Sequence, residues 1–260
     1  MKEQLLTGQV LGCGLNIESY ESATKLLVSM TQDGVPHLVA AANTHLVSEA
    51  HEDPEFGRVL ERFDLVLPDG MPLVWALQLD GHVIRERVYG PYLMDYVIRH
   101  SPIELKHYFF GGTEQCLDAL RDQLVKLRPG LQIVGMVSPP FGKWDPLTEN
   151  RLIQEINRSG ADLIWVALGG VKQEKWLAAH QDEFKAGVFL AVGDAFVLLA
   201  GLRTFAPAWM QRIGMTWLYR LAQEPKRLMG RYLKYNARFV ISFMKERWVL
   251  AHGQRLRAKK

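Results

Sequence analysis

Short apolar runs alternate with helical patterns along the first 200 residues of the chain. Helical patterns over residues 44–50, 71–79 and 114–127 follow three of these runs directly. Nearly continuous apolar strands that alternate with helices are typical of a parallel sheet with helices on both faces. The pattern predicts an α/β fold with strands over residues 37–42, 65–67, 107–110, 131–136, 162–168 and 188–192.

Polar residues and glycines that follow these strands are predicted to share one edge of the sheet. In an open parallel sheet, ligands bind outside the carboxyl ends of the strands. The residues that this rule brings together are Asn43, Asp69, Gly111, Gly112, Gly169, Gln173 and Asp194. This edge is therefore the expected place of a functional site.

Asp69 follows the apolar residues 65–67, with only Pro68 between them. Asp-Gly is a common pair in turns, so Asp69 and Gly70 can be explained by the formation of a turn alone. A carboxylate at the end of a strand can instead serve as a catalytic base. The pattern itself leaves both interpretations open.

Two glycine turns join a predicted strand to a predicted helix, at Gly111-Gly112 and at Gly169-Gly170. Glycines let the backbone approach a phosphate, and the N-terminus of a helix attracts an anion. Tight packing between strand and helix explains the first turn equally well. Gln173 and Glu174 fall in the first turn of the next helix, where they can face the cleft or favour the helix dipole.

The C-terminal segment has a different pattern. Residues 207–225 predict one helix that ends at Pro225, and a second helix follows from Lys226. One face of the second helix carries Arg227, Arg231, Lys234, Arg238 and Lys245, and a stripe beside it carries Leu228, Tyr232, Tyr235, Phe239 and Phe243. Such a pair of stripes suits a membrane interface, and a helix packed on the body with a solvated basic face explains it equally well.

Charge is divided unevenly along the 260 residues, whose net charge is +3. Residues 201–260 hold 14 Lys and Arg against two acids, a local charge of +12, whereas residues 1–200 carry −9. An acidic body with a basic tail suggests contact with an anionic surface. Membrane phosphate, nucleic acid and an acidic partner all fit this description.

Several functional classes lack their signature. Cys13 and Cys116 form neither a metal-binding spacing nor a disulfide framework, and a reducing cytoplasmic setting fits them. No signal-peptide core is present, and the most apolar stretch, residues 187–202, is shorter than the roughly 20 residues of a membrane-spanning helix. The glycine fingerprints of dinucleotide and P-loop sites and the Gly-x-Ser-x-Gly elbow are missing. With no Asp-x-Asp pair and no metal-ligand spacing, we expect no metal and no other cofactor.

Seven motifs occur in the order found in one family. They are AANTHLV (40–46), DLVLPDGMPL (64–73), RVYGPYLMDYV (87–97), YFFGGTE (108–114), ALGGVKQEKW (167–176), VGDAFVLLAG (192–201) and APAWMQRIGMTWLYRLAQEPKRLMGRYL (206–233). The chain resembles the WecG/TagA/CpsF glycosyltransferases of bacterial surface-polysaccharide synthesis over roughly residues 8–245.

This resemblance implies a reaction and a set of residue roles. The family transfers a sugar from a UDP-sugar to a polyprenyl-diphosphate-linked sugar, with inversion, at the cytoplasmic face of the membrane. Its fold is Rossmann-like, its general base matches Asp69, and Asn43 and Gln173 match positions that line its active site. Its C-terminal appendage carries arginines that help to complete the site and contact the membrane, matched here by Arg220, Arg227 and Arg231.

The chemistry agrees with these roles. Inversion is a single in-line displacement, so one base that takes the proton of the acceptor hydroxyl is sufficient. A retaining hydrolase would need two closely spaced carboxylates, and no obvious pair is present. A diphosphate leaving group needs positive charge or backbone N–H groups more than protonation.

Three positions depart from the family pattern. Val197 stands where members usually have Asp, Phe205 replaces a basic residue before Ala-Pro, and Val171 replaces Pro in the Gly-x-Pro-Lys-Gln-Glu turn. None of these positions is Asp69. We interpret them as marks of a divergent subfamily with a different donor or acceptor.

We therefore expect an inverting glycosyltransferase with a Rossmann-like catalytic domain at residues 1–203 and a helical, basic, membrane-associating appendage at residues 204–260. A UDP-ManNAc-like donor is favoured over UDP-glucose or a UDP-uronic acid. Expected acceptor- or sugar-binding residues are Asn43, Thr44, Gln173 and Arg87, and expected nucleotide-binding residues are Gly111, Gly112, Gly169, Glu174 and Asp194.

The expected partners are the UDP-sugar, the lipid-linked acceptor and the inner face of the cell membrane, where the protein would be peripheral. Self-association is possible, and no nucleic acid is expected. The alternative is a non-catalytic α/β module whose basic tail binds nucleic acid or an acidic partner.

Overall fold

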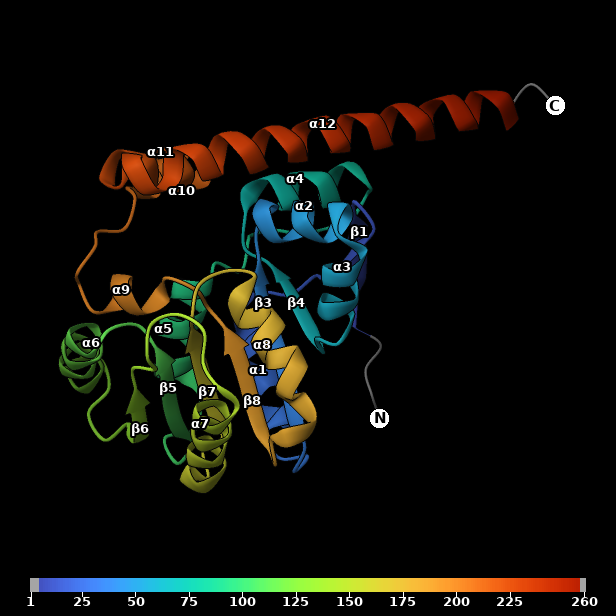
Figure 1. Ribbon diagram of the computed structural model, residues 1–260. Helices are drawn as coiled ribbons and strands as arrows, with labels where there is room; N and C mark the ends of the chain where they lie inside the picture. The colour runs from blue at the N-terminus through green and yellow to red at the C-terminus, as the bar shows by residue number, and fades with distance from the viewer. Residues whose placement is uncertain (1–4, 258–260) are drawn as a thin grey trace.

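The computed structural model describes residues 5–257, without the side chains of residues 227, 231–233, 250, 251 and 253–257. A six-stranded sheet in the order β4-β3-β8-β7-β5-β6 forms its centre, and all paired neighbours in it are parallel (Figure 1). Its strands are β3 (Pro36–Ala42), β4 (Leu65–Pro68), β5 (Lys106–Gly111), β6 (Gln132–Val137), β7 (Leu163–Ala167) and β8 (Gly187–Ala191). Each predicted apolar run overlaps one of these strands, so the predicted parallel α/β fold is confirmed.

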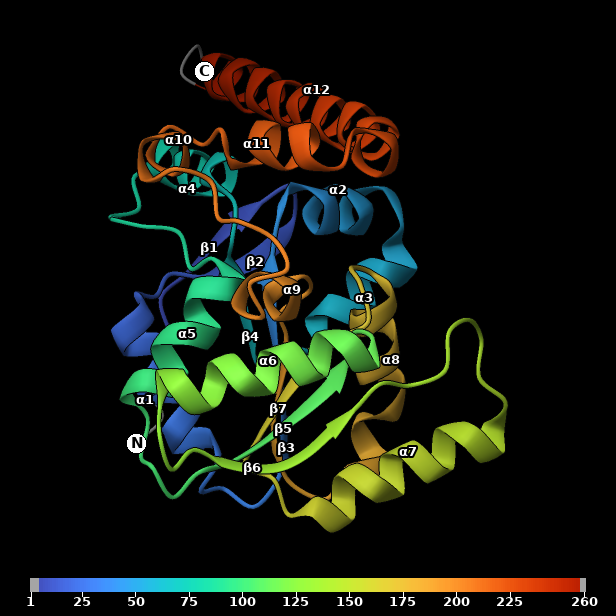
Figure 2. The same ribbon diagram turned by 90° about the vertical axis from the view of Figure 1, so that its left-hand side faces the viewer.

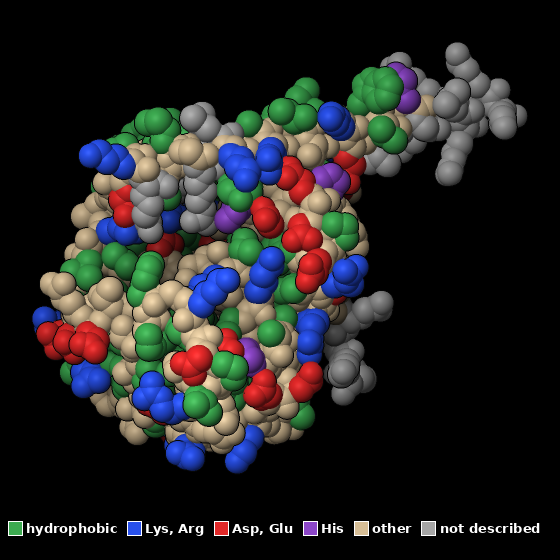
Figure 3. All heavy atoms as spheres, in the orientation of Figure 1, with side chains coloured by type: hydrophobic (Ala, Val, Ile, Leu, Met, Phe, Trp, Pro, Cys, Tyr) green, Lys and Arg blue, Asp and Glu red, His purple; other side chains and the backbone are tan. Residues whose placement is uncertain are grey.

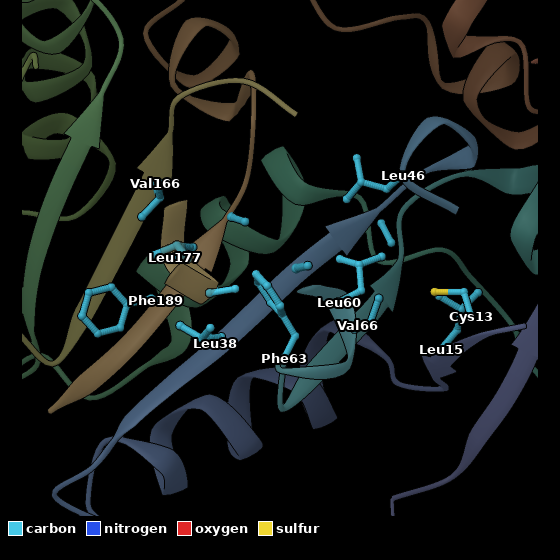
Figure 4. Packing of buried hydrophobic residues seen from close by; sticks show 14 of the residues in the cluster. Cys13, Leu15, Leu38, Leu46, Leu60, Phe63, Val66, Val166, Leu177 and Phe189 are labelled. Carbon is cyan, nitrogen blue, oxygen red and sulfur yellow. The ribbon is translucent and has the colours of Figure 1, made fainter. Parts of the chain in front are cut away.

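Both faces of the sheet are covered by helices. Successive strand residues point to opposite faces, so Leu38 packs in one core cluster and its neighbour Val39 in the other. Phe189 and Leu177 belong to the first cluster, part of which Figure 4 shows. The first face is covered by α2 (Thr44–Glu52), α3 (Pro54–Glu61), α7 (Pro146–Ser159) and α8 (Lys172–His180), and the second by α1 (Tyr20–Met30), α5 (Gly90–His100), α6 (Glu114–Leu127) and α9 (Ala195–Leu199). Burial on two faces explains why most of the strands are nearly continuous apolar runs, and the edge strand β6 is the one that is only partly covered.

A short antiparallel hairpin, β1 (Thr7–Val10) and β2 (Cys13–Asn16), lies beside the edge strand β4. The side chain of Asn16 accepts a hydrogen bond from the backbone N–H of Val66 at 2.7 Å. A polar side chain thus satisfies one backbone donor of the edge strand. The apolar pattern did not predict this hairpin, because its strands are only four residues long.

Three helices follow the sheet: α10 (Ala208–Arg212), α11 (Thr216–Gln223) and α12 (Pro225–Arg257). The single helix predicted over residues 207–225 is wrong, because Gly214 adopts a left-handed φ of 73° and divides it. A Cβ at Gly214 would lie 2.7 Å from the Trp75 ring, so glycine also permits close packing there. The second helix is confirmed, and Pro225 occupies its first position, where a missing N–H costs nothing.

Helix α12 crosses one end of the body, over α2 and α4 (Met71–Leu79), as Figures 1 and 2 both show. Leu228 and Phe239 of the predicted stripe are buried and Phe243 packs against a core cluster, so these three residues contact the body instead of facing a membrane. Ion pairs fasten the helix where Arg238 meets Glu52 at 2.6 Å and where Arg247 meets Asp80 at 2.7 Å. Among the described residues, no helix combines the length and the apolar character that crossing a bilayer requires.

Candidate active site

Asp69 lies at the carboxyl end of β4, directly before the turn into α4. Its backbone N–H donates to the carbonyl of Ala42 at 2.8 Å, which ties the ends of β3 and β4 together. Its Oδ2 accepts a hydrogen bond from the backbone N–H of Gly90 at 3.1 Å. Because Gly90 is the first residue of α5, the carboxylate sits at the positive end of that helix.

Burial raises the pKa of Asp69 to about 6. The positive charge of Arg87 and the N–H of Gly90 oppose this rise, Asp194 adds to it, and Arg220 opposes it. A carboxyl group with a pKa near neutrality is a stronger base than an ordinary aspartate, yet it is still ionised at pH 7. This is the environment expected of a general base rather than of a surface turn residue.

Asn43 and Thr44 both have partners inside the protein. The Oδ1 atom of Asn43 accepts hydrogen bonds from the N–H groups of His45 and Leu46, at 3.0 and 3.3 Å, and so caps α2. The hydroxyl of Thr44 donates to Oδ1 of Asn236 in α12 at 3.0 Å. This segment therefore connects the edge of the sheet to the C-terminal helix.

Arg87 also reaches the C-terminal helices. Its guanidinium donates to the hydroxyl of Thr216 at 3.1 Å and to Oε1 of Gln211 at 3.4 Å, and it lies 4.5 Å from the centre of the Tyr89 ring. Gln211 in turn donates to the hydroxyl of Tyr92 at 2.7 Å. Arg87 thus holds α10 and α11 against the body close to Asp69.

Gln173 and Glu174 are buried at the start of α8, so they do not line an open cleft as the sequence allowed. Gln173 donates to Oε1 of Glu174 at 2.9 Å, and among the described residues its own carbonyl oxygen has no hydrogen-bond partner. The turn before them contains Val171 at a φ of 68°. A β-branched residue rarely adopts that conformation, which marks a strained turn.

The three glycines predicted to bind the nucleotide all have a positive φ, but the structural reason for a glycine differs among them. Gly111 has a φ of 121°, and a Cβ there would lie 2.4 Å from the carbonyl oxygen of Ala167, so close strand packing accounts for it. Gly112 has a φ of 71° and donates its N–H to the same carbonyl at 3.2 Å. Gly169 has a φ of 94° with open space around its Cα, which leaves its backbone approachable.

Asp194 follows β8 and faces the C-terminal helices. Its Oδ2 lies 2.6 Å from Nη2 of Arg220 in α11 and 3.9 Å from Nη1 of Arg203. Arg203 also forms an ion pair with Glu224 at 2.6 Å. The side chains of Arg227 and Arg231 lie outside the described part of the structure.

The sequence missed Arg203, Gln211, Thr216 and Asn236, although the structure joins all four to predicted site residues. Arg203 follows one of the motifs by only two positions, and nothing distinguishes it from a surface arginine until the chain is folded. A cavity of about 620 Å³ lies elsewhere, between the β1–β2 hairpin, α3 and the start of β4, and no predicted site residue lines it. Among the described residues, no group of His, Cys, Asp or Glu is arranged to hold a metal ion, so metal independence stays a prediction.

Residues 9–253 match the model of one family, the glycosyl transferase WecG/TagA/CpsF family. The chain belongs to this family. The resemblance that the seven motifs indicated is therefore confirmed over most of the chain, and the protein is a glycosyltransferase.

Relatives of this family member include three enzymes named N-acetylglucosaminyldiphosphoundecaprenol N-acetyl-beta-D-mannosaminyltransferase. The one from Bacillus spizizenii is 28% identical over 190 residues, which cover 73% of this chain and 72% of the relative. Those from Bacillus subtilis and Staphylococcus aureus are each 24% identical and cover 73% of both chains.

Proposed function

We propose that this glycosyltransferase transfers a sugar from a UDP-sugar to a polyprenyl-diphosphate-linked sugar, with inversion at the anomeric carbon. The observation that carries the proposal is the position of Asp69, a carboxylate of raised pKa at the strand edge that is influenced by two arginines, Arg87 and Arg220. The names of the relatives support a lipid-diphosphate acceptor and favour an N-acetylmannosamine donor.

In this mechanism Asp69 takes the proton of the acceptor hydroxyl as its oxygen attacks the anomeric carbon of the donor. The N–H of Gly90 holds Oδ2, which orients the carboxyl group. The UDP leaving group departs with negative charge, and the nearby arginines stabilise that charge. Gly169, with its open backbone, is the glycine best placed for contact with the nucleotide, and Gly111 and Gly112 shape the neighbouring turn.

Asn43, Thr44, Arg87, Gln173 and Glu174 have a supporting part in this proposal. Thr44 and Arg87 fix the strand edge to the C-terminal helices, and Asn43 caps α2 beside them, so these residues shape the wall of the site that would hold the acceptor. The unsatisfied carbonyl of Gln173 is available to a sugar hydroxyl if the strained turn at Val171 opens.

Membrane contact is proposed for the outer side of α12. Val240, Ile241, Met244 and Trp248 are exposed there at helical spacing, and Lys234 and Lys245 are exposed beside them. Figure 3 shows hydrophobic side chains along the upper edge over α11 and α12. Apolar and basic side chains on one helix suit an anionic membrane surface, which would place the protein peripherally on the inner face of the membrane.

A UDP-release assay tests the reaction. It uses purified protein, a short-chain polyprenyl-diphosphate-N-acetylglucosamine or -glucose acceptor, and UDP-linked N-acetylmannosamine, glucose and uronic acids. Release that needs both substrates and is lost in Asp69→Asn supports the proposal and identifies the donor. If no pair gives release and the protein binds no UDP, the non-catalytic binding module becomes the better description.

A further inference from the structure

Tyr89 is an almost completely buried tyrosine next to the proposed base. Its side chain is 4% exposed, and it precedes Gly90, whose N–H holds Oδ2 of Asp69. Its backbone N–H donates to the hydroxyl oxygen of Tyr20 at 3.1 Å, which fixes the residue at the start of α5. The guanidinium of Arg87 lies over the ring, 4.5 Å from its centre. The ring of Tyr89 is therefore held firmly beside the carboxylate that ends β4.

The hydroxyl of Tyr89 has no hydrogen-bond partner among the described residues. Two neighbouring tyrosines differ from it in this respect. The hydroxyl of Tyr20 accepts the N–H of Tyr89, and the hydroxyl of Tyr92 accepts a hydrogen bond from Gln211 at 2.7 Å. The ring of Tyr92 meets that of Tyr89 edge-on, with 5.6 Å between the ring centres. Because buried hydroxyls are normally hydrogen-bonded, an unpaired one beside a base is a candidate contact for a ligand.

Charges on several side chains act on this hydroxyl. Burial raises the pKa of Tyr89 well above its ordinary value. The charge of Asp194 adds to the rise and that of Arg220 opposes it. Asp69 raises the pKa further and Arg87 lowers it, with smaller effects. The hydroxyl therefore stays protonated at neutral pH, within electrostatic reach both of the base and of the ion pair that Asp194 forms with Arg220.

A hydroxyl in this position faces the sugar that is transferred. In an in-line displacement the attacking oxygen and the departing phosphate lie on opposite sides of the anomeric carbon. In the proposed function Asp69 takes the proton of the attacking oxygen, and Arg220 is one of the arginines that stabilise the charge of the leaving group. A group within reach of both is therefore beside the sugar ring between them. A neutral hydroxyl suits that ring, because it can donate to a sugar oxygen and also accept from a sugar hydroxyl.

We propose that the hydroxyl of Tyr89 forms a hydrogen bond with an oxygen of the donor sugar and so takes part in selecting the sugar that is transferred. This assignment rests on the proposed function and adds a specificity-determining residue to it. The contact is made with the sugar alone, so it contributes nothing to the binding of UDP. A donor without a polar group at this position would leave the hydroxyl unpaired, and the site would therefore disfavour that donor.

Titration calorimetry on the full-length protein tests the proposal with UDP and with UDP-linked N-acetylmannosamine, N-acetylglucosamine and glucose. Tyr89→Phe removes only the hydroxyl and retains the ring between Arg87 and Tyr92. It should bind UDP as the wild type does, and it should bind the UDP-sugar that the wild type prefers about three- to tenfold more weakly. In the UDP-release assay kcat/KM for that donor should fall by at least the same factor, and KM for the acceptor should stay unchanged. Tyr96→Phe is the matched control, because it removes a hydroxyl from a ring of α5 that stacks on Tyr20 at 6.0 Å, and its constants should equal those of the wild type.

Two further measurements distinguish a contact with the sugar from a structural role of the hydroxyl. The hydroxyl has no partner in the protein, so Tyr89→Phe should unfold at a temperature no lower than that of the wild type. The acidic limb of its kcat/KM profile should keep an apparent pKa of about 6, because the surroundings of Asp69 are retained. A lower unfolding temperature together with a shifted limb would assign the hydroxyl to the fold and overturn the inference.

The outcomes also separate this inference from the proposed function. If Tyr89→Phe weakens UDP and UDP-sugars by the same factor, the hydroxyl contacts the nucleotide and the inference is wrong. Unchanged affinity for every UDP-sugar, or a loss confined to KM for the acceptor, would overturn it as well. If the wild type transfers sugar and any of these results is found, the inference alone fails. If the wild type binds neither UDP nor any UDP-sugar, the proposed function fails with it.

Discussion

The backbone N–H of Gly90 donates to Oδ2 of Asp69 over 3.1 Å, so the first residue of α5 holds the carboxylate that ends β4. This contact is possible because Gly90 has no side chain. A Cβ there would lie 3.2 Å from the carbonyl oxygen of Val192, 3.3 Å from the Cβ of Ala41 and 3.5 Å from Asp69 Oδ2. Three strand ends thus meet around one glycine.

Gly90→Ala should therefore disturb both folding and catalysis. The added methyl group is crowded by the carbonyl oxygen of Val192 and the Cβ of Ala41, and overpacking of this kind costs about 1–3 kcal/mol. We expect that loss in urea denaturation and a fall in turnover of at least about tenfold, because Asp69 shifts. Gly230→Ala in α12 is the control, since its Cβ would meet nothing within 4 Å and its stability should not fall. Normal turnover in Gly90→Ala would show that Asp69 does not depend on this contact.

Asp69→Asn should be more stable than the wild type at neutral and alkaline pH. The folded-state pKa of about 6 lies above the ordinary value of 3.8, so the carboxyl contributes its full stability below pH 3.8 and loses it as the pH rises through 6. The neutral amide avoids this loss. We expect a gain of about 1–3 kcal/mol at pH 8 that vanishes near pH 4, measured by denaturant unfolding at both values. Turnover should fall by about 10²-fold or more. A variant that is less stable at pH 8 would contradict the raised pKa.

The pH dependence of kcat/KM should have an acidic limb with an apparent pKa of about 6, because protonated Asp69 cannot accept a proton. The negative charge of Asp194 raises that pKa, so Asp194→Asn should move the limb to lower pH. A steady-state profile from pH 4.5 to pH 8 on both proteins measures the shift. If the limb does not move, the charge of Asp194 does not affect the pKa of Asp69.

Ile241→Glu/Met244→Glu should weaken binding to vesicles that contain anionic phospholipid. Both side chains are more than half exposed on α12, and a carboxylate there opposes insertion and is repelled by the lipid headgroups. Cosedimentation at low and high salt measures the effect, and UDP affinity should remain unchanged. Val125→Glu/Leu147→Glu alters two exposed apolar residues of α6 and α7 in the same way and should bind vesicles normally. Equal losses in the two double variants would argue against α12 as the contact.

Strands β3, β4, β5, β7 and β8 could be predicted because they are largely buried on both faces and therefore mostly apolar, whereas the edge strand β6 is only partly covered. Helices α1, α3 and α5 were not predicted, and α12 was. The break at Gly214 could not be foreseen, because its left-handed turn depends on close packing against Trp75, which is distant in the sequence. The domain division at residues 203 and 204 and the expected self-association stay predictions.

The candidate site was predicted in part. The rule that ligands bind at the carboxyl ends of parallel strands selected Asp69 and Asp194, which the structure places within electrostatic reach of each other. It could not show that Asn43 caps a helix or that Asp194 pairs with Arg220. Those facts depend on side-chain directions and on the path of the C-terminal helices, which a linear pattern does not contain.

The hydrogen bond from Val66 to Asn16 has a consequence for the behaviour of the protein in concentrated solution. An uncovered edge strand is a template on which another chain can pair, and β4 would be such an edge without the β1–β2 hairpin beside it. The hairpin therefore protects β4 from edge-to-edge pairing with another chain. The Asn16 side-chain amide holds the hairpin to β4 through its hydrogen bond with Val66. Loss of this amide would first be noticed as poor solubility, while the distant chemistry of the strand ends stayed intact.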